Sequence, residues 1–152
     1  LSAAKAYAER AIALNPSFAS GHATLGHILA YKGDPLAGVP HLERAIRLDP
    51  HFSQQFLHFL GTAYLLAGDF ARAAETYRKR IALSPGTDLS RAFLASALGH
   101  LGDVEGARKV WAELREINPT YSFAHHLGRL PISEADARRI TAGLDAAGLT
   151  DR

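Results

Sequence analysis

The sequence contains no cysteine, which excludes disulfide bonds and thiolate metal sites and agrees with a reducing compartment such as the cytoplasm. No apolar run approaches the roughly 20 residues that span a bilayer, so no membrane segment is predicted. A strong charge of one sign is also missing, because 17 basic residues stand against 15 acidic ones. We interpret the densest basic cluster, Arg78-Lys79-Arg80, as solvated helix surface. We therefore expect a cytoplasmic protein without nucleic-acid or membrane partners.

Recognisable catalytic patterns are missing too. The sequence has no Gly-x-Gly-x-x-Gly pattern, no phosphate-binding loop and no nucleophile elbow. Its histidines lack the spacing that places two metal ligands on one helix face, and no carboxylate completes a zinc pattern; the closest pairs are His22 and His27, His51 and His58, and His125 and His126. We therefore expect no catalytic residues, no metal and no cofactor in this chain.

What the sequence does contain is one sequence motif that occurs three times. A Gly-Asp pair recurs at intervals of 35 and 34 residues, beginning at Gly33, Gly68 and Gly102. Prolines follow at intervals of 34, 35 and 34 residues, at Pro16, Pro50, Pro85 and Pro119. A fixed period of this length indicates a stack of similar units, each with room for two helices of three to four turns.

Local signals place the helix ends within each unit. Gly68 suits the left-handed residue that ends a helix, and Asp69 suits the cap of the next one. In the first unit, Pro35 stands at the first helical position, where its missing N–H costs nothing. Pro40 lies deeper in the same helix, so we expect this helix to be kinked or to start irregularly before Pro40.

These units resemble the tetratricopeptide repeat. They share a Leu-Gly or Leu-Ala pair in the first helix, Gly-Asp at the turn, a small residue early in the second helix, a large one four positions later, and a closing proline. The first unit (19–52) has Leu25-Gly26, Gly33-Asp34, Gly38, Leu42, Ala45 and Pro50; the second (54–87) has Leu60-Gly61, Gly68-Asp69, Ala73, Tyr77 and Pro85; the third (88–121) has Leu94-Ala95, Gly102-Asp103, Ala107, Trp111 and Pro119. Arg80 and Leu114 replace the usual Ala, so we expect looser or rearranged packing there.

The resemblance implies an all-α, right-handed superhelical solenoid of antiparallel helix pairs, with about nine helices and no β-sheet. Residues 1–16 match the second helix of a repeat whose first helix is missing, so we expect the chain to be a fragment. Residues 122–130 begin a repeat that Pro131 cuts short, and Ser133 opens a capping helix over 133–148. We expect this helix to cover the edge near Val110, Trp111 and Leu114 and to leave the concave groove open.

A second resemblance concerns the C-terminal string "RLPISEADARRITAGLDAAGL". It is similar to the end of bacterial proteins that carry such repeats behind a class III nucleotide cyclase domain or a DNA-binding winged-helix domain. None of the metal-binding or nucleotide-binding segments of a cyclase is present. On this alternative, the chain is a regulatory or self-association domain of a larger bacterial protein.

In the tetratricopeptide family the first helices line a concave groove that holds a peptide, which implies a non-catalytic scaffold with a protein or peptide partner. The known carboxylate clamp is absent, because Ala23, His27, Phe59, Leu89 and Phe93 stand at such positions. We predict an apolar, histidine-rimmed groove, while self-association as a homo-oligomer stays open. The groove positions of the family correspond to His27, Tyr31, Gln55, His58, Phe59, Thr62, Leu89, Phe93, Ser96 and His100.

Overall fold

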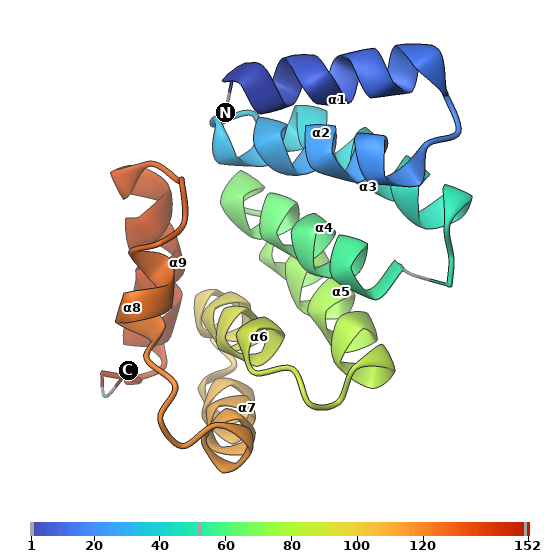
Figure 1. Cartoon of the computed structure of the whole chain (residues 1–152). Helices are drawn as coiled ribbons and strands as arrows, with labels where there is room; N and C mark the ends of the chain where they lie inside the picture. Colours follow the sequence, from blue (N-terminus) through green and yellow to red (C-terminus); the bar gives the residue numbers. More distant parts are fainter. Residues whose placement is uncertain (1, 52, 151) are drawn as a thin grey trace.

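The computed structural model describes residues 2–51, 53–150 and 152, and this part of the chain contains nine helices and no strand (Figure 1). Most consecutive helices are joined by short turns, so neighbours run antiparallel and stack as hairpins into a solenoid. The helices are α1 (Ser2–Leu14), α2 (Ala19–Tyr31), α3 (Pro35–Leu48), α4 (Ser53–Ala67), α5 (Phe70–Leu83), α6 (Leu89–His100), α7 (Val104–Ile117), α8 (Phe123–Leu127) and α9 (Glu134–Ala146).

The repeated Gly-Asp pairs build the three turns inside the hairpins. The glycines adopt positive φ angles of 93°, 81° and 79°, a region that L side chains rarely enter, at Gly33, Gly68 and Gly102. The aspartate that follows each glycine accepts a hydrogen bond from the backbone N–H three residues later, as Asp103 does from Gly106 at 2.9 Å. Each Gly-Asp pair therefore ends one helix and caps the next.

Helix α3 runs unbroken from Pro35 to Leu48, with Pro40 on its exposed side. Asp34 caps it, and the Gly38 N–H donates to the Asp34 carbonyl at 3.3 Å. The expected irregular start is therefore wrong, because the cap and first turn form normally before the proline is reached. A kink at Pro40 stays a prediction.

Small and large residues alternate where the paired helices touch. A Cβ atom on Gly38 would lie 2.4 Å from the Gly26 carbonyl oxygen, so α2 and α3 approach at backbone distance. In the next hairpin, Gly61 leaves the space that the Tyr77 ring occupies. The core that results contains fully buried large side chains from every pair, including Leu42, Tyr77, Phe93, Leu114 and Phe123.

The C-terminal helix α9 lies along α6, where Ser96 Oγ donates to the Ile140 carbonyl at 2.6 Å and His100 Nε2 donates to the Arg139 carbonyl at 2.7 Å. The contact buries Ile140, Leu144 and Ala147 completely, as a cap requires.

The expected place for this helix, the edge near Val110, Trp111 and Leu114, is therefore wrong. The expectation that it leaves the concave groove open is wrong in part, because α9 covers the predicted groove residues Ser96 and His100. Tyr121 and Phe123 already pack against Trp111, with ring centroids 6.4 and 6.3 Å apart, so the segment leading into α8 covers that edge. Helix α9 touches α7 at its end, where Arg108 Nε donates to the Ala147 carbonyl at 3.0 Å.

Candidate functional site

Helices α2, α4, α6 and α8 surround an apolar cavity of about 250 Å³. A second cavity of about 240 Å³ lies beside it and shares His58, Phe59 and Leu89 as walls. We call the two together the groove. Its lining residues are His27, Ile28, Tyr31, Gln55, His58, Phe59, Arg80, Leu89, His126, Leu130 and Pro131.

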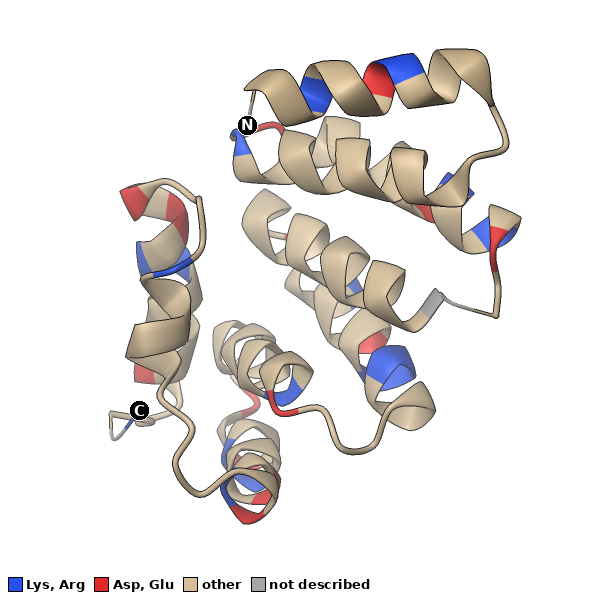
Figure 2. Cartoon of the chain, viewed as in Figure 1, with Lys and Arg blue, Asp and Glu red and all other residues tan. Residues whose placement is uncertain are grey.

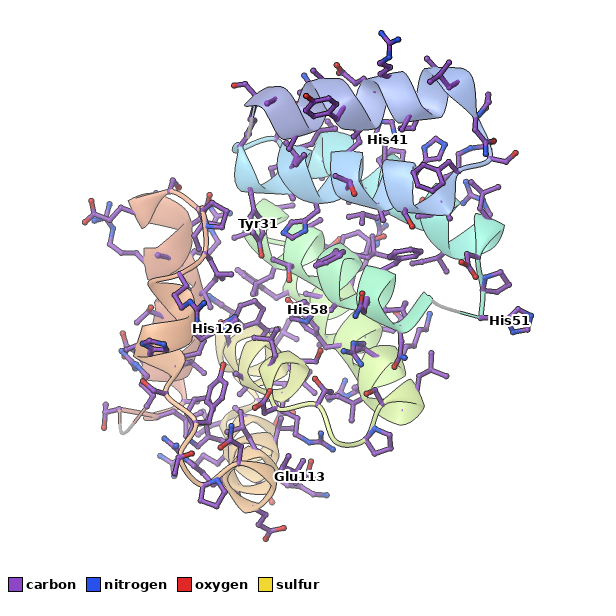
Figure 3. The ribbon with its side chains drawn as sticks, viewed as in Figure 1. Tyr31, His41, His51, His58, Glu113 and His126 are labelled. Atoms are coloured by element: carbon purple, nitrogen blue, oxygen red, sulfur yellow. The ribbon has the colours of Figure 1, made fainter. Side chains whose placement is uncertain are left out.

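Six of the ten residues predicted from the sequence line the groove: His27, Tyr31, Gln55, His58, Phe59 and Leu89. They come from three helices, because each first helix of a hairpin turns the same face toward the concave side. Figure 3 shows Tyr31 and His58 on this side together with His126 of α8, whereas His51 lies at the far edge of the molecule.

The other four predicted residues lie outside the cavity and hold the scaffold together. Thr62 Oγ1 lies 2.9 Å from the Tyr77 hydroxyl in the core. Phe93 is fully buried and packs against Phe123, with ring centroids 6.1 Å apart. Ser96 and His100 hold α9 through the two hydrogen bonds described above.

Five lining residues were missed by the sequence interpretation: Ile28, Arg80, His126, Leu130 and Pro131. His126 and the residues after it belong to the truncated repeat, whose short helix α8 turns back over the groove. Arg80 is the one of these that the sequence marks as unusual, because it stands where the family usually has Ala. It comes from a second helix, α5, and reaches the groove through the length of its side chain.

An aromatic wall joins α2 to α4. The His27 ring stacks on Phe59 and meets the edge of Tyr31, with both centroid separations at 4.1 Å. His27 and Tyr31 are four residues apart on α2 and therefore share one face. The ring edges and faces present a mostly apolar surface with polar tips, which suits partner side chains of the same character.

The histidines of the groove are neutral at pH 7. Burial lowers the pKa of His27 to about 4, and burial together with the nearby Arg80 lowers that of His58 to about 3. Burial also lowers the pKa of His126. His58 Nδ1 lies 2.9 Å from Ser90 Oγ, which fixes its ring.

Several polar atoms around the cavity are buried without a hydrogen-bond partner among the described residues. Nε2 of His27 and Nε2 of His126 belong to this group. A buried polar atom without a partner costs about 1–3 kcal/mol, so these atoms favour a ligand that supplies donors or acceptors.

Charge is scarce on the helices that line the groove. Helices α2 and α4 contain no Asp, Glu, Lys or Arg, and α6 contains only Arg91, whereas the second helices of the pairs carry both signs (Figure 2). Arg91 is occupied elsewhere, since its Nη1 donates to the carbonyls of Pro85 and Thr87 at 2.6 Å each. The groove is therefore an uncharged surface apart from Arg80.

The interpretation of 78–80 as solvated surface holds for Arg78 and Lys79, which are exposed, and only in part for Arg80, which is half-buried. The Arg80 side chain points between α4 and α6, where its Nε and Nη1 are buried without partners among the described residues. Burial lowers the pKa of this guanidinium. A cavity of about 240 Å³ lies beside Arg80, and Leu114 is fully buried. Looser packing at Arg80 stays a prediction.

No three His, Asp or Glu side chains within residues 2–51, 53–150 and 152 come together in the manner of a metal site. In the same part of the chain, no helix has both the length and the apolar character needed to cross a membrane.

The sequence matches the family model of the tetratricopeptide repeat twice, over residues 23–88 and 60–122, which together span well over half of the chain. The chain therefore belongs to the tetratricopeptide repeat family. Members of this family generally mediate protein–protein interactions and are typically non-catalytic scaffolds. A search of curated proteins found no match to this sequence. The similarity of the C-terminal string to cyclase-linked and winged-helix repeat proteins stays a prediction.

Proposed function

We propose that this chain is a protein-interaction module that holds a peptide segment of its partner in the groove between α2, α4, α6 and α8. The observation that carries the proposal is the convergence of five predicted binding residues on one cavity of about 250 Å³, with a sixth, Gln55, in the cavity beside it. Such a volume exceeds the roughly 150 Å³ that holds a benzene ring in an engineered apolar cavity, so a large apolar side chain fits.

The groove residues support recognition rather than chemistry. Phe59 and Tyr31 supply apolar area, and the neutral imidazoles of His27 and His126 supply donors and acceptors without charge. A few polar groups in an apolar concave surface orient a bound segment, while burial of its side chains supplies most of the affinity.

Selection of displayed random peptides on the purified chain tests the proposal. Peptides of about 12 residues are long enough to pass through the groove in an extended form. We expect a selected peptide to bind the wild type and to lose about tenfold or more in affinity on Phe59→Ala, as truncation of a central interface side chain commonly does. Fluorescence anisotropy of the labelled peptide measures both affinities.

Phe18→Ala is the matched control, because it makes the same truncation at an exposed ring on the turn before α2, outside the groove. Equal loss on both variants, or binding that ignores both, would contradict the proposal. Light scattering addresses the competing role in self-association. A mass that rises with concentration and reverts on Phe59→Ala would assign the groove to a second copy of the chain.

A further inference from the structure

Arg80 is the single charged side chain among the described residues that line the groove. It comes from α5 and lies beside Gln55, His58 and Leu89. No Asp or Glu belongs to the lining of either cavity, so the free groove carries a positive charge without a counter-charge in its walls.

Two other cations of the same hairpin, Arg72 and Lys79, have acidic partners. Lys79 Nζ lies 3.3 Å from Glu75, and Arg72 Nε lies 3.4 Å from Asp69. Arg80 differs, because its Nε and Nη1 are both buried and have no hydrogen-bond partner in the part of the chain that the structure describes. Arg80 as a whole is only partly buried, and its guanidinium keeps its charge at neutral pH, so the two buried nitrogens without partners favour a ligand that supplies acceptors.

The cavity at Arg80 shares wall residues with the larger apolar cavity. His58, Phe59 and Leu89 line both, so a group that contacts Arg80 lies next to a group that fills the space between Phe59 and His126. A ligand of the whole groove therefore carries one group of each kind close together.

We propose that the groove recognises a peptide segment in which a large apolar side chain lies within a few residues of an Asp or Glu. The apolar side chain fills the cavity between His27, Phe59 and His126, and the carboxylate pairs with the guanidinium of Arg80. A carboxylate matches the fork of donors on a guanidinium, and their charges cancel inside the groove. This inference rests on the proposed function and adds the chemistry of the partner.

The test uses the peptides selected on the wild-type chain and measures their affinities for Arg80→Gln and for Lys79→Gln. Both variants remove one positive charge from α5, but Lys79 is exposed and lies outside the groove. We expect an acidic residue near the apolar anchor in the selected peptides. Arg80→Gln is expected to weaken binding about tenfold or more, and Lys79→Gln less than about twofold.

Two further measurements make the pairing specific. Replacing the acidic residue of the peptide with its amide is expected to weaken binding to the wild type by the same factor, and to leave binding to Arg80→Gln nearly unchanged. Arg80→Ala, which restores the residue common in the family, repeats the test in case Arg80→Gln folds poorly. Circular dichroism checks that each variant is helical.

The outcomes separate the inference from the proposed function. If peptides bind and Phe59→Ala abolishes binding, but Arg80→Gln and Arg80→Ala bind as the wild type does, the role of Arg80 is overturned and the proposed function stands. If no selected peptide depends on Phe59, the proposed function fails and the inference fails with it. Peptides that depend on Phe59 but carry no acidic residue also overturn the inference.

Discussion

Gly99 of α6 and Gly143 of α9 meet at backbone distance, because a Cβ atom on Gly99 would lie 1.7 Å from the Gly143 carbonyl oxygen. The reverse substitution is as crowded, since a Cβ atom on Gly143 would lie 2.1 Å from the Ser96 carbonyl oxygen. The two helices therefore cross where neither has a side chain, and this crossing holds α9 in place.

Gly143→Ala is expected to destabilise the protein by roughly 1–3 kcal/mol, because a methyl group at the crossing forces α9 away from α6. The gain in helix propensity of about 1 kcal/mol opposes this loss only in part. Urea unfolding measures the difference. Gly86→Ala is the control, since nothing lies within 4 Å of that position and its φ is not positive. Equal stability of the two variants would contradict the close crossing.

The protein is expected to become less stable as the pH is lowered into the mildly acidic range. The pKa of His58 drops from its ordinary 6.5 to about 3 on folding, mainly through burial, and that of His27 drops to about 4. Between these values and 6.5, the unfolded chain binds more protons than the folded one. The contribution of these two histidines to the free energy of unfolding is therefore fully present above about pH 6.5. It declines as the pH falls below that value, by up to about 1.4 kcal/mol per pH unit for each histidine.

Urea unfolding at a series of pH values between about 7 and about 5 measures this decline, in a range where most carboxylates stay ionised. His58→Phe removes one of the titrating groups and keeps a ring beside Phe93. Its stability is expected to depend less steeply on pH than that of the wild type. Parallel curves for the two proteins would show that His58 is not the source.

Arg91 is expected to contribute far more to stability than its ion-pair partner. It is 7% exposed, and its guanidinium donates to the carbonyls of Pro85 and Thr87 as well as to Glu113. Arg91→Met leaves two carbonyls of the α5–α6 connection without this donor, so we expect a loss of about 2–4 kcal/mol. The comparison variant is Glu113→Gln, and Figure 3 labels Glu113. Because the Glu113 side chain is 44% exposed, we expect this variant to lose less than about 1 kcal/mol of stability. Similar thermal midpoints for the two variants would refute the ranking.

Pro40→Ala is expected to leave stability unchanged or to raise it. Alanine restores the N–H that proline lacks, and a proline inside a regular helix costs about 3 kcal/mol. The opposing effect is the greater freedom of the unfolded chain, worth about 1 kcal/mol or less. Pro35→Ala serves as the comparison, because at the first helical position the missing N–H costs nothing. A lower melting temperature for Pro40→Ala than for Pro35→Ala would contradict the expectation.

The hairpins were predictable because their signals are local. A left-handed glycine such as Gly68 and a capping aspartate such as Asp69 act within a few residues, whatever lies elsewhere in the chain. The position of α9 was not predictable in the same way. Its apolar residues Ile140 and Leu144 suit any apolar surface, and the choice of α6 depends on Gly99, which lies far away in the sequence.

The groove residues divide in the same way, into those that local sequence patterns indicate and those that depend on contacts between distant parts of the chain. Helical periodicity places His27, His58 and Phe59 on the concave side, so the sequence indicates them directly. The period alone does not separate Phe59, which lines the cavity, from Phe93, which α8 buries. Arg80 was missed because a long side chain reaches a surface that its own helix does not form.

The walls of the groove come from helices α2, α4, α6 and α8, which follow one another along the solenoid. His27 stands near one end of this stack and His126 near the other, yet both face the same cavity of about 250 Å³. A peptide bound in this cavity would contact both α2 and α8 and so link two distant parts of the solenoid. Binding of such a peptide is expected to restrain the curvature of the stack, and slower amide hydrogen exchange in α2 and α8 is the expected readout.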